Sequence, residues 1–497
     1  MIGEKMKILL IYPKFPDTFW SFKHALKFIQ KKSSFEPLGL LTVAAMLPVE
    51  WEKRLVDLNA QPLSDKDLAW ADYAFISAMI VQSESAKKVI ARCKCAGLKI
   101  VAGGPLFTMD YMQFEDVDHF VLNEAEMTLQ PFLHDLALGH PRRIYTSTEF
   151  PDIHKTPAPL WELADLKHYA SIAIQYSRGC PFDCEFCNIT SLFGRRSRVK
   201  TPEQIIYELD KLYQRGWRKS VFFVDDNFIG NKKHIKEELL PALIEWQKGK
   251  TGIPFNTEVS INIADDAELM NLMFIAGFDT VFIGIETPDT DGLSECNKKQ
   301  NLNRDLVADV KRIQRAGLQV QAGFIVGFDS DTQSIFQRQI DFIQKSGIVT
   351  AMVGLLQAPE GTRLHKRMKE EGRLIGAFSG DNVGSTTNFV PVMNLEKLQS
   401  GYREVMKYIY APKNYYARVK IFLKEYKAPN FSIPVNREYV VAFLLSVVKL
   451  GFLGKECIQY WKLILWTIFH RPKLFSQAIT LSIYGYHFRR VYDLSVA

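Results

Sequence analysis

Long hydrophobic runs are missing from this sequence of 497 residues. A helix that crosses a membrane needs roughly 20 consecutive apolar residues. No uninterrupted stretch comes near that length, and 24% of all residues are charged, which excludes a bundle of membrane-spanning helices. The N-terminal segment has only a short apolar stretch with no small-residue cleavage site behind it, so we expect a cytoplasmic protein.

Cysteine is also scarce and unevenly placed. There are seven, an odd number, and three of them fall within eight residues; they are Cys93, Cys95, Cys180, Cys184, Cys187, Cys296 and Cys457. Small disulfide-stabilised domains carry denser and evenly paired cysteines. The pattern therefore excludes a disulfide framework and indicates that the three close cysteines are ligands.

A strong net charge is lacking over most of the chain. The whole sequence carries +7, but residues 411–497 alone contain thirteen Lys or Arg against four Asp or Glu, so residues 1–410 are nearly neutral. The same tail holds 17 of the 61 aromatic residues. This mixture suits an anionic, apolar surface such as a membrane interface. Nucleic acid is the competing partner, but no DNA-reading motif is present and we expect none to bind.

The first region, residues 1–148, alternates short apolar segments with helical ones. The predicted strands are Lys7–Tyr12, Arg54–Leu58, Tyr73–Ser77, Lys99–Gly103 and His119–Leu122. Strands this short and apolar are buried on both faces, which is typical of parallel sheets. A helix over Ser85–Gly97, closed by its glycine, is one of the intervening elements. We predict a doubly wound α/β sheet whose ligands bind at the carboxyl ends of its strands.

Prolines at 151, 157 and 159 predict an extended linker, which we place at residues 149–168. A second βα series follows over residues 169–371. Its predicted strands are Ser171–Tyr176, Ser220–Asp225, Pro254–Val259, Thr280–Glu286, Gln319–Val326 and Ile348–Leu355. Six repeats suit a partial (β/α)6 barrel with its site at the strands' carboxyl ends. Residues 372–497 lose this rhythm and predict a helical, basic and aromatic region.

The motif that carries chemistry directly follows the first predicted barrel strand. It reads Cys180-x3-Cys184-x2-Cys187, so three thiolates in one loop can converge on one iron-sulfur cluster. Four irons need four ligands, and three cysteines leave one iron open to a substrate or cofactor. The alternative is a zinc site or incidental buried thiols, but zinc typically takes four protein ligands and no suitable fourth is near. We expect one [4Fe-4S] cluster.

This motif resembles that of the radical S-adenosylmethionine (SAM) superfamily, and the resemblance covers roughly residues 170–360. It implies that SAM binds the open iron through its amino and carboxylate groups and is cleaved to a 5′-deoxyadenosyl radical. Residues at the ends of later strands match the superfamily's SAM-contact positions; they are Asp225, Asp226, Asn227, Glu258, Ser260, Glu286, Gly323 and Gly327. The alternative is that the acidic residues are helix caps or loop charges and that the glycines only form turns.

The first region resembles the cobalamin-binding domain that precedes the barrel in a large subclass of radical SAM enzymes. The matching positions that we assign to cobalamin are Pro37, Asp57, Ser77, Gly103 and Gly104. Small residues would let the backbone approach a bulky ligand, although a sheet of this class also needs turn glycines. The Asp-x-His-x-x-Gly motif, whose His ligates cobalt in many cobalamin domains, is absent from residues 1–150. The lower ligand of cobalt is therefore not predicted.

The stretch after Cys187 and the C-terminal segment Ser482–Arg490 resemble the radical SAM group that includes hopanoid C-2 methylase and archaeal tetraether ring synthases. The resemblance implies a methyltransferase that acts on an unactivated carbon of a polycyclic or isoprenoid lipid. One alternative is a radical SAM lipid enzyme that forms rings or carbon-carbon bonds without methyl transfer. Another is a non-catalytic corrinoid or SAM sensor.

Two partners follow from this interpretation, a lipid-like substrate and an electron donor such as a flavodoxin or ferredoxin. Residues 439–454 and 460–469 are apolar with interleaved lysines, too short to span a membrane but suited to lie in its interface. They predict peripheral contact, which would place the protein at the inner face of the membrane. The alternative is that they cap the barrel as core helices.

Overall fold

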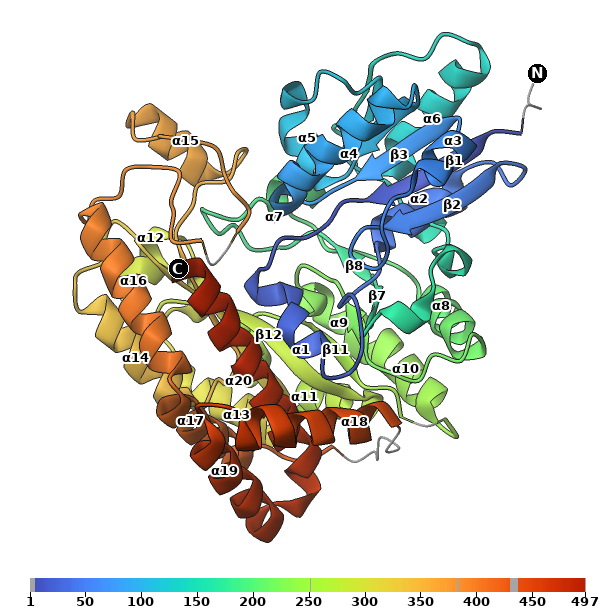
Figure 1. The fold of residues 1–497 in the computed structure, drawn as a ribbon. Coiled ribbons are helices and arrows are strands. Elements are labelled where there is room, and N and C mark those ends of the chain that lie inside the picture. The colour runs from blue at the N-terminus through green and yellow to red at the C-terminus, as the bar shows by residue number, and fades with distance from the viewer. Residues whose placement is uncertain (1–4, 251, 382–383, 430–436, 497) are drawn as a thin grey trace.

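The computed structural model describes residues 5–250, 252–381, 384–429 and 437–496, so residues 1–4 and 497 at the ends of the first and last predicted regions lie outside it. Figure 1 shows an N-terminal α/β sheet in blue, a second sheet in green and yellow, and a C-terminal group of helices in orange and red. The predicted fold class, an α/β sheet followed by a partial βα barrel and a helical region, is confirmed.

The first sheet has six parallel strands in the order β2-β1-β3-β4-β5-β6. Their bounds are Lys7–Tyr12 (β1), Glu52–Asp57 (β2), Tyr73–Ser77 (β3), Lys99–Gly103 (β4), His119–Val121 (β5) and Ile144–Tyr145 (β6). The connecting helices are Leu38–Met46 (α2), Asp65–Trp70 (α3), Ser83–Cys95 (α4), Pro105–Asp110 (α5) and Ala125–Ala137 (α6). The order reverses beside β1, as in doubly wound sheets, so the ligand edge lies at the carboxyl ends of β1 and β3.

The second sheet also has six strands, in the order β14-β13-β12-β11-β10-β7, and every pair is parallel. The strands are Ile172–Ile174 (β7), Val221–Phe223 (β10), Phe255–Glu258 (β11), Phe278–Glu286 (β12), Gln319–Val326 (β13) and Ala351–Leu355 (β14). Helices outside it include Pro202–Gln214 (α8), Leu240–Gln247 (α10), Ala267–Ala276 (α11), Thr290–Glu295 (α12), Leu306–Ala316 (α13) and Ile335–Ser346 (α14). Thr201 caps α8 by accepting from the Gln204 N–H, as the Thr-Pro start predicts.

The edge strands of the barrel, β7 and β14, are contacted by segments from the N-terminal region and from the C-terminal helices. Along β7, both carboxylate oxygens of Glu36 accept from the Ala173 N–H, at 3.1 and 3.2 Å. Beside β14, the Tyr410 hydroxyl donates to the Ala351 carbonyl oxygen at 2.7 Å. Such contacts satisfy edge groups that would otherwise be open to another chain.

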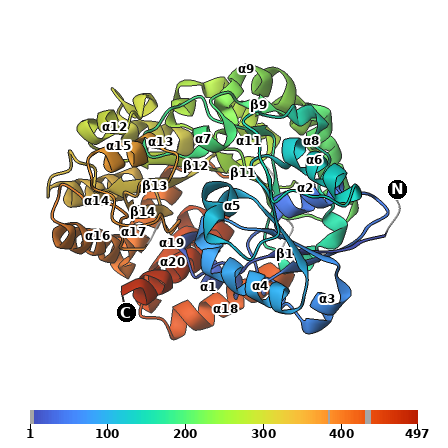
Figure 2. The same cartoon turned by 90° about the horizontal axis from the view of Figure 1, so that it is seen from above.

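The C-terminal helices fold back onto the barrel. Their bounds are Arg363–Glu370 (α15), Leu395–Tyr410 (α16), Pro412–Glu425 (α17), Arg437–Ser446 (α18), Cys457–His470 (α19) and Phe475–Val496 (α20), with a π-helical turn at Val447–Phe452 (η11) between α18 and α19. Helix α20 packs against the short helix Lys23–Leu26 (α1), as both views show (Figure 1, Figure 2). The Phe19 and Phe488 rings stack there at 4.2 Å. In the described part of the chain, no helix is both long and apolar enough to cross a membrane.

The hydrophobic core runs through both sheets. One face of the first sheet, including Leu9, Ile76 and Ile100, forms a cluster of its own. The other face, including Ile8 and Leu10, joins the same continuous cluster as the barrel and the C-terminal helices. A proline-rich linker would suggest a first domain with its own separate core. The structure instead has a core that the first sheet shares with the barrel.

The segment between the two sheets is packed rather than extended throughout. It contains a short 3-10 turn at Ile153–Lys155 (η4), and the Trp161 side chain that follows is 1% exposed. Thr156 donates to a Glu126 carboxylate oxygen at 2.7 Å, and the Leu160 N–H donates to the Leu41 carbonyl at 3.1 Å. These contacts fix the segment to α6 and to α2, which its three prolines alone do not reveal.

Candidate functional site

The three close cysteines lie in a loop between the short strand Ser177–Arg178 (β8) and the helix Ile189–Phe193 (α7). Gly179 opens the loop with φ +91°, and an added Cβ would stand 2.5 Å from the Arg196 carbonyl oxygen, so this position requires glycine. Inside the loop the Cys187 N–H donates to the Cys184 carbonyl at 3.2 Å. All three cysteine residues are half-buried.

Burial governs the protonation of these thiols. It raises the pKa of Cys180 and Cys184 and raises that of Cys187 to about 12. Within the described residues, no three Cys, His, Asp or Glu side chains are close enough together to hold a single metal ion. A cluster differs from a zinc site because each thiolate binds its own iron, so its cysteines need not meet at one point. Three thiols in one loop suit a cluster that keeps one iron open.

Asp225 and Asp226 hold the backbone that leads into this loop. Asp225 is 1% exposed and accepts from the backbone N–H groups of Ser177 and Tyr176. Asp226 accepts from the Gly179 N–H at 2.9 Å. Burial raises the pKa of Asp225 to about 7 and of Asp226 to about 6. Both therefore support the cysteine loop, and a direct contact with SAM stays a prediction for each.

The next strand end supplies Glu258, which is half-buried. No described residue donates a hydrogen bond to its carboxyl group, and burial raises its pKa to about 8, with Asp226 and Asp225 adding repulsion. An unpartnered carboxyl beside two others is a favourable place for a cationic ligand group. Beside it, the Ser260 N–H donates to Asn227 Oδ1 at 3.1 Å, so these two predicted residues hold each other.

Glu286 ends β12 in a strained conformation. Its φ is +64°, in the left-handed region, and a β-bulge interrupts the pairing of β12 with β13 beside it. Lys298 Nζ donates to its carboxylate at 2.7 Å. Gly284 makes room for this pair, because an added Cβ would lie 2.2 Å from Glu286 Oε1. Lys298 was not predicted from the sequence; it follows α12 with no recognisable motif, and only the fold brings it near Cys184.

Gly323 on β13 and Gly327, which directly follows that strand, make their contacts away from these carboxylates. An added Cβ at Gly323 would meet Phe282 at 3.0 Å, inside the barrel. Gly327 has φ +106° and donates its N–H to Asp331 Oδ2 at 2.8 Å. The first glycine makes space within the barrel and the second forms a turn, so contact with adenine stays a prediction.

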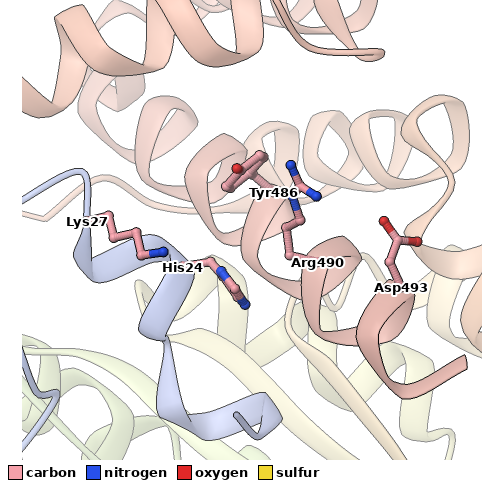
Figure 3. Close-up of a pocket in the computed structure, with 5 residues that line it drawn as sticks. All are labelled: His24, Lys27, Tyr486, Arg490 and Asp493. Carbon is pink, nitrogen blue, oxygen red and sulfur yellow. The ribbon is translucent and has the colours of Figure 1, made fainter. Parts of the chain in front are cut away.

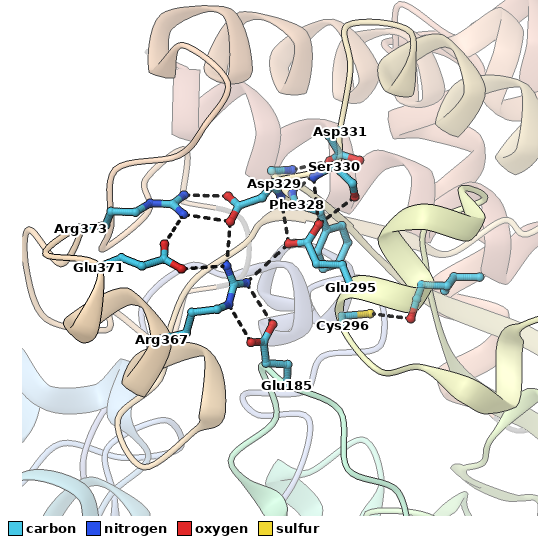
Figure 4. A network of polar contacts seen from close by, with 12 residues as sticks. Glu185, Glu295, Cys296, Phe328, Asp329, Ser330, Asp331, Arg367, Glu371 and Arg373 are labelled. Atoms are coloured by element: carbon cyan, nitrogen blue, oxygen red, sulfur yellow. Dashed lines mark hydrogen bonds and ion pairs between the residues drawn. The ribbon is translucent and has the colours of Figure 1, made fainter.

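An ion-pair network clamps the cysteine loop from outside (Figure 4). Arg367 on α15 donates to both carboxylate oxygens of Glu185, at 2.8 and 3.1 Å, and Glu185 lies between Cys184 and Cys187 in sequence. Arg367 also donates to Asp329 at 2.7 Å. The backbone adds to this, because the Leu364 N–H donates to the Glu185 carbonyl at 3.0 Å. A two-pronged guanidinium contact fixes orientation as well as distance.

At the first sheet, the structure brings Ser77, Gly103 and Gly104 together. Ser77 ends β3, Gly103 ends β4, and an added Cβ at Gly104 would lie 2.4 Å from Ser77 Oγ. Gly104 has φ +86° and ψ −178°, a conformation that is essentially restricted to glycine. These three half-buried residues lie together at the ligand edge, and we call them the cradle; their contact with cobalamin stays a prediction.

Pro37 and Asp57 do not lie beside Ser77, Gly103 and Gly104 but among other residues. Asp57 is 2% exposed and accepts from the Asn59 N–H at 2.9 Å and from the Tyr169 hydroxyl at 3.0 Å. Pro37 is buried and follows Glu36, whose pKa burial raises to about 8. Both residues thus lie where the first sheet meets the barrel. Their assignment to cobalamin stays a prediction.

A buried ion-pair group joins the two sheets beside the cysteine loop. Arg178, directly before Gly179, pairs with Glu124 at 2.6 Å and with Glu126 at 2.9 Å. Arg198 pairs with the same Glu124 at 2.6 Å. Glu124 and Glu126 lie at the start of α6, so these contacts fix the cysteine loop relative to the first sheet. No local sequence pattern indicates these pairs, because the partners are over fifty residues apart.

A separate pocket of about 290 Å³ lies where α1 meets α20. It is lined by His24, Lys27, Tyr486, Arg490 and Asp493 (Figure 3). None of these residues belongs to the cysteine loop or to the strand ends described above.

Comparison with known proteins identifies the family. The model of the radical SAM superfamily matches residues 174–369, and that of a domain of unknown function (DUF4070) matches residues 362–496. An uncharacterised methyltransferase of Synechocystis sp. is 41% identical, with coverage of 97% of this chain and 91% of that protein. Hopanoid C-2 methylase of Rhodopseudomonas palustris is 34% identical, with coverage of 92% of this chain and 88% of that protein.

Solved structures agree on the fold. The cobalamin-dependent SAM radical enzyme OxsB with aqua-cobalamin bound matches with a TM-score of 0.62 at 14% identity, over 99% of this chain and 81% of that one. The radical SAM methyltransferase TsrM from Kitasatospora setae matches with a TM-score of 0.57 at 14% identity, over 74% and 78% of the two chains. The resemblance predicted from the cysteine motif is confirmed, and the alternative of a non-catalytic sensor loses its support. The protein belongs to the radical SAM superfamily and, within it, to the methyltransferase family that contains hopanoid C-2 methylase.

Proposed function

We propose that this radical SAM methyltransferase depends on cobalamin and transfers a methyl group to an unactivated carbon of a polycyclic or isoprenoid lipid. The main observation that supports an apolar, lipid-like substrate is the apolar inner surface of the barrel. Side chains of alternate strand positions point inward, and Phe222, Phe282 and Met352 are half-buried at such positions, whereas their neighbours Val221, Val281 and Val353 are fully buried.

The N-terminal segment contributes to the same inner surface. The Trp20 ring lies 5.4 Å from Phe282 in an edge-on contact, and its Nε1 donates to Met352 Sδ at 2.9 Å. Phe35 lies 5.2 Å from Phe222. Pockets for apolar ligands combine such walls with few polar groups at one end. Here the polar end is the cluster of carboxyl side chains around Glu258 at the strand ends. An apolar substrate would therefore lie next to the SAM site, farther inside the barrel.

The chain's own residues would hold three cofactors. Cys180, Cys184 and Cys187 would bind the [4Fe-4S] cluster, the carboxylates at the ends of β11 and β12 would bind SAM, and the Ser77, Gly103 and Gly104 cradle would face cobalamin. When bound, these groups supply the electron that cleaves SAM and the carrier of the methyl group. The reaction needs an external one-electron donor, for which a flavodoxin or ferredoxin is suited. The residues of the protein orient these groups and exclude water.

Removal of one inner aromatic ring tests the substrate class. We expect Phe282→Ala to raise the KM for the lipid by roughly tenfold, because about 1.5–3 kcal/mol of apolar contact is lost. SAM cleavage to 5′-deoxyadenosine should continue, because no carboxylate or cysteine is changed. The measurement is lipid methylation and 5′-deoxyadenosine formation in the same assay.

Phe282→Leu serves as the matched variant, since it keeps most of the apolar volume and should keep most of the lipid affinity. Tyr207→Ala removes an aromatic ring on α8 that is 55% exposed, so it controls for the loss of a ring away from the barrel interior. Unchanged lipid methylation in Phe282→Ala would contradict the proposed substrate position. An equal loss of SAM cleavage would show that Phe282 supports the SAM site instead.

Arg367 should act as a positioning residue for the cluster. In Arg367→Ala, Glu185 loses both of its guanidinium contacts, and charged hydrogen bonds of this kind contribute about 1.5–3 kcal/mol each. We expect faster loss of iron to a chelator and a changed EPR signal of the reduced cluster on addition of SAM. Arg367→Lys should restore little, because an ammonium cannot make the two-pronged contact.

The control for this experiment is Arg315→Ala. It removes the ion pair between Arg315 on α13, whose side chain is 62% exposed, and Glu425 on α17. Exposed pairs of this type contribute little, so its cluster should resist chelation like the parent's. If Arg367→Ala retains iron and the EPR signal as well as Arg315→Ala does, the clamp has no role in holding the cluster.

A further inference from the structure

Exposed apolar side chains gather on one part of the C-terminal region. Among the residues that the structure describes, 22 large hydrophobic ones are exposed, and ten of these fall between residues 439 and 469. They are Tyr439, Val440, Leu444, Val448, Phe452, Leu453, Ile458, Leu465, Ile468 and Phe469. Single exposed apolar residues need no explanation, but a contiguous patch of them marks an interaction surface.

The first half of this patch is a regular stripe. Val440, Leu444, Val448 and Phe452 are spaced by four residues along α18 and η11, which places them on one side of the helix. Leu450 and Ser446, on the opposite side, are completely buried. The helix therefore has one side packed on the protein and one apolar side that faces outward.

The second half lies on α19. Ile458, Leu465 and Phe469 are 65%, 51% and 79% exposed at helical spacing, and Lys462 falls in the same row. Tyr460 and Thr467 on the other side are completely buried. Helix α19 therefore repeats the arrangement of α18.

The two stripes meet at the turn between the helices. The Phe452 ring lies 6.1 Å from that of Trp461, and Trp461 Nε1 donates to the Gly451 carbonyl at 3.0 Å. Further along, the Ser446 and Tyr460 hydroxyls bond at 2.8 Å and tie the helices together from within. We call the exposed side of this pair, formed by the ten residues named above, the hairpin surface. Figure 1 places α18 and α19 at the end of the molecule opposite to the first sheet.

The charges around the hairpin surface are mainly positive. Between residues 439 and 492 the sequence has a single acidic residue, Glu456. That residue is 5% exposed and is paired with Arg489. Lys455, Lys462 and Lys473 are exposed in the same region. The surface thus presents apolar stripes framed by lysines, and the nearby carboxylate of Glu438 on α18 is paired with Lys31 and Lys219.

We propose that the hairpin surface lies on a membrane that contains anionic lipids. Aromatic and aliphatic side chains would enter the boundary between headgroups and acyl chains, and the lysines would contact the headgroups. A second copy of the chain fits less well, because pairing two such surfaces would bring lysines against lysines. The proposal rests on the surface alone and does not depend on the identity of the substrate.

Vesicle binding by the full-length, cluster-loaded protein tests the proposal. The probes are vesicles of phosphatidylcholine alone and of phosphatidylcholine with phosphatidylglycerol, and the measurement is co-sedimentation. We expect the parent to bind the anionic vesicles and to bind neutral ones several-fold more weakly. Phe452→Ser with Phe469→Ser should weaken binding to anionic vesicles by about tenfold or more. Lys455→Glu with Lys462→Glu should remove the preference for anionic vesicles.

Matched controls come from exposed residues elsewhere. Val49→Ser with Met112→Ser removes two exposed apolar side chains, 94% and 75% exposed, from the first sheet's surroundings. Lys66→Glu with Lys94→Glu reverses two exposed lysines there. Both control pairs should bind vesicles like the parent. Absence of vesicle binding by the parent, or equal binding by the hairpin variants and the controls, would overturn the proposal. A parent dimer that Phe452→Ser with Phe469→Ser converts to a monomer would overturn it in favour of a second copy.

Discussion

Replacement of Cys184 by alanine is expected to abolish the cluster and the chemistry that depends on it. The substitution removes one of three thiolates, and one iron must stay open for SAM, so no spare ligand can restore the site. Lys298, Gln300 and Asp183 lie nearby and are not thiols. The thiol of Cys296 also lies near Cys184, but it is 1% exposed and donates to the Leu293 carbonyl oxygen, so we expect it not to replace the lost ligand. We expect 5′-deoxyadenosine formation to fall by at least about a hundredfold. Iron content and anaerobic SAM cleavage measure the loss.

Corrinoid binding separates this effect from unfolding. The Ser77, Gly103 and Gly104 cradle belongs to the first sheet, and one face of that sheet has its own hydrophobic cluster. The Cys184→Ala protein should therefore retain bound corrinoid. Cys457→Ala, a half-buried cysteine on α19, is the matched control and should keep the cluster. SAM cleavage by Cys184→Ala at a rate near the parent's would contradict the cluster assignment.

The second large effect is expected at the other cofactor. Gly104→Val should lower corrinoid affinity by at least about tenfold, because a side chain meets Ser77 Oγ and the backbone there favours glycine by about 1–3 kcal/mol. Methyl transfer should fall with it. SAM cleavage should persist without methylation, because the added side chain would meet Ser77 and Ala78 and no residue of the cysteine loop. Corrinoid absorbance after purification and the ratio of methylated product to 5′-deoxyadenosine measure both effects.

Gly97→Val provides the control for backbone strain. Gly97 has φ +78° at the end of α4, and an added Cβ would meet nothing within 4 Å. This variant also places a side chain at a positive φ in the same domain but leaves the cradle unchanged, so corrinoid should remain bound. Equal loss of corrinoid in both variants would mean that the domain is destabilised and that the cradle has no special role.

The strands were predictable because their local pattern is strong. Tyr73–Ser77 and Lys99–Gly103 have the predicted bounds, since each is a short apolar run buried on both faces. The two-residue strand β6 was missed, because Ile144–Tyr145 has no pattern of its own and pairs only through its register with β5. The cysteine motif was predictable for a related reason, because its ligands are close in sequence.

The remainder of the site depends on contacts between distant segments. Lys298 reaches Glu286 only because of the β-bulge and Gly284, and Arg367 reaches Glu185 across 182 residues of sequence. No local pattern encodes either contact. Asp57 was predicted to contact cobalamin, but its carboxylate accepts hydrogen bonds from the Asn59 N–H and the Tyr169 hydroxyl. The continuous core could not be predicted either, since the packing of two sheets against each other leaves no trace in periodicity.

Product analysis tests the central claim of lipid C-methylation most directly. The protein would be expressed in a hopanoid-making host that lacks its own methylase, and extracted lipids and SAM products would be measured by mass spectrometry. We predict a lipid that gains one CH2, with one S-adenosylhomocysteine and one 5′-deoxyadenosine formed for each methyl group. Loss of hydrogen from the lipid without S-adenosylhomocysteine would indicate ring or bond formation instead. An unchanged lipid profile while SAM is cleaved would contradict the proposed lipid substrate.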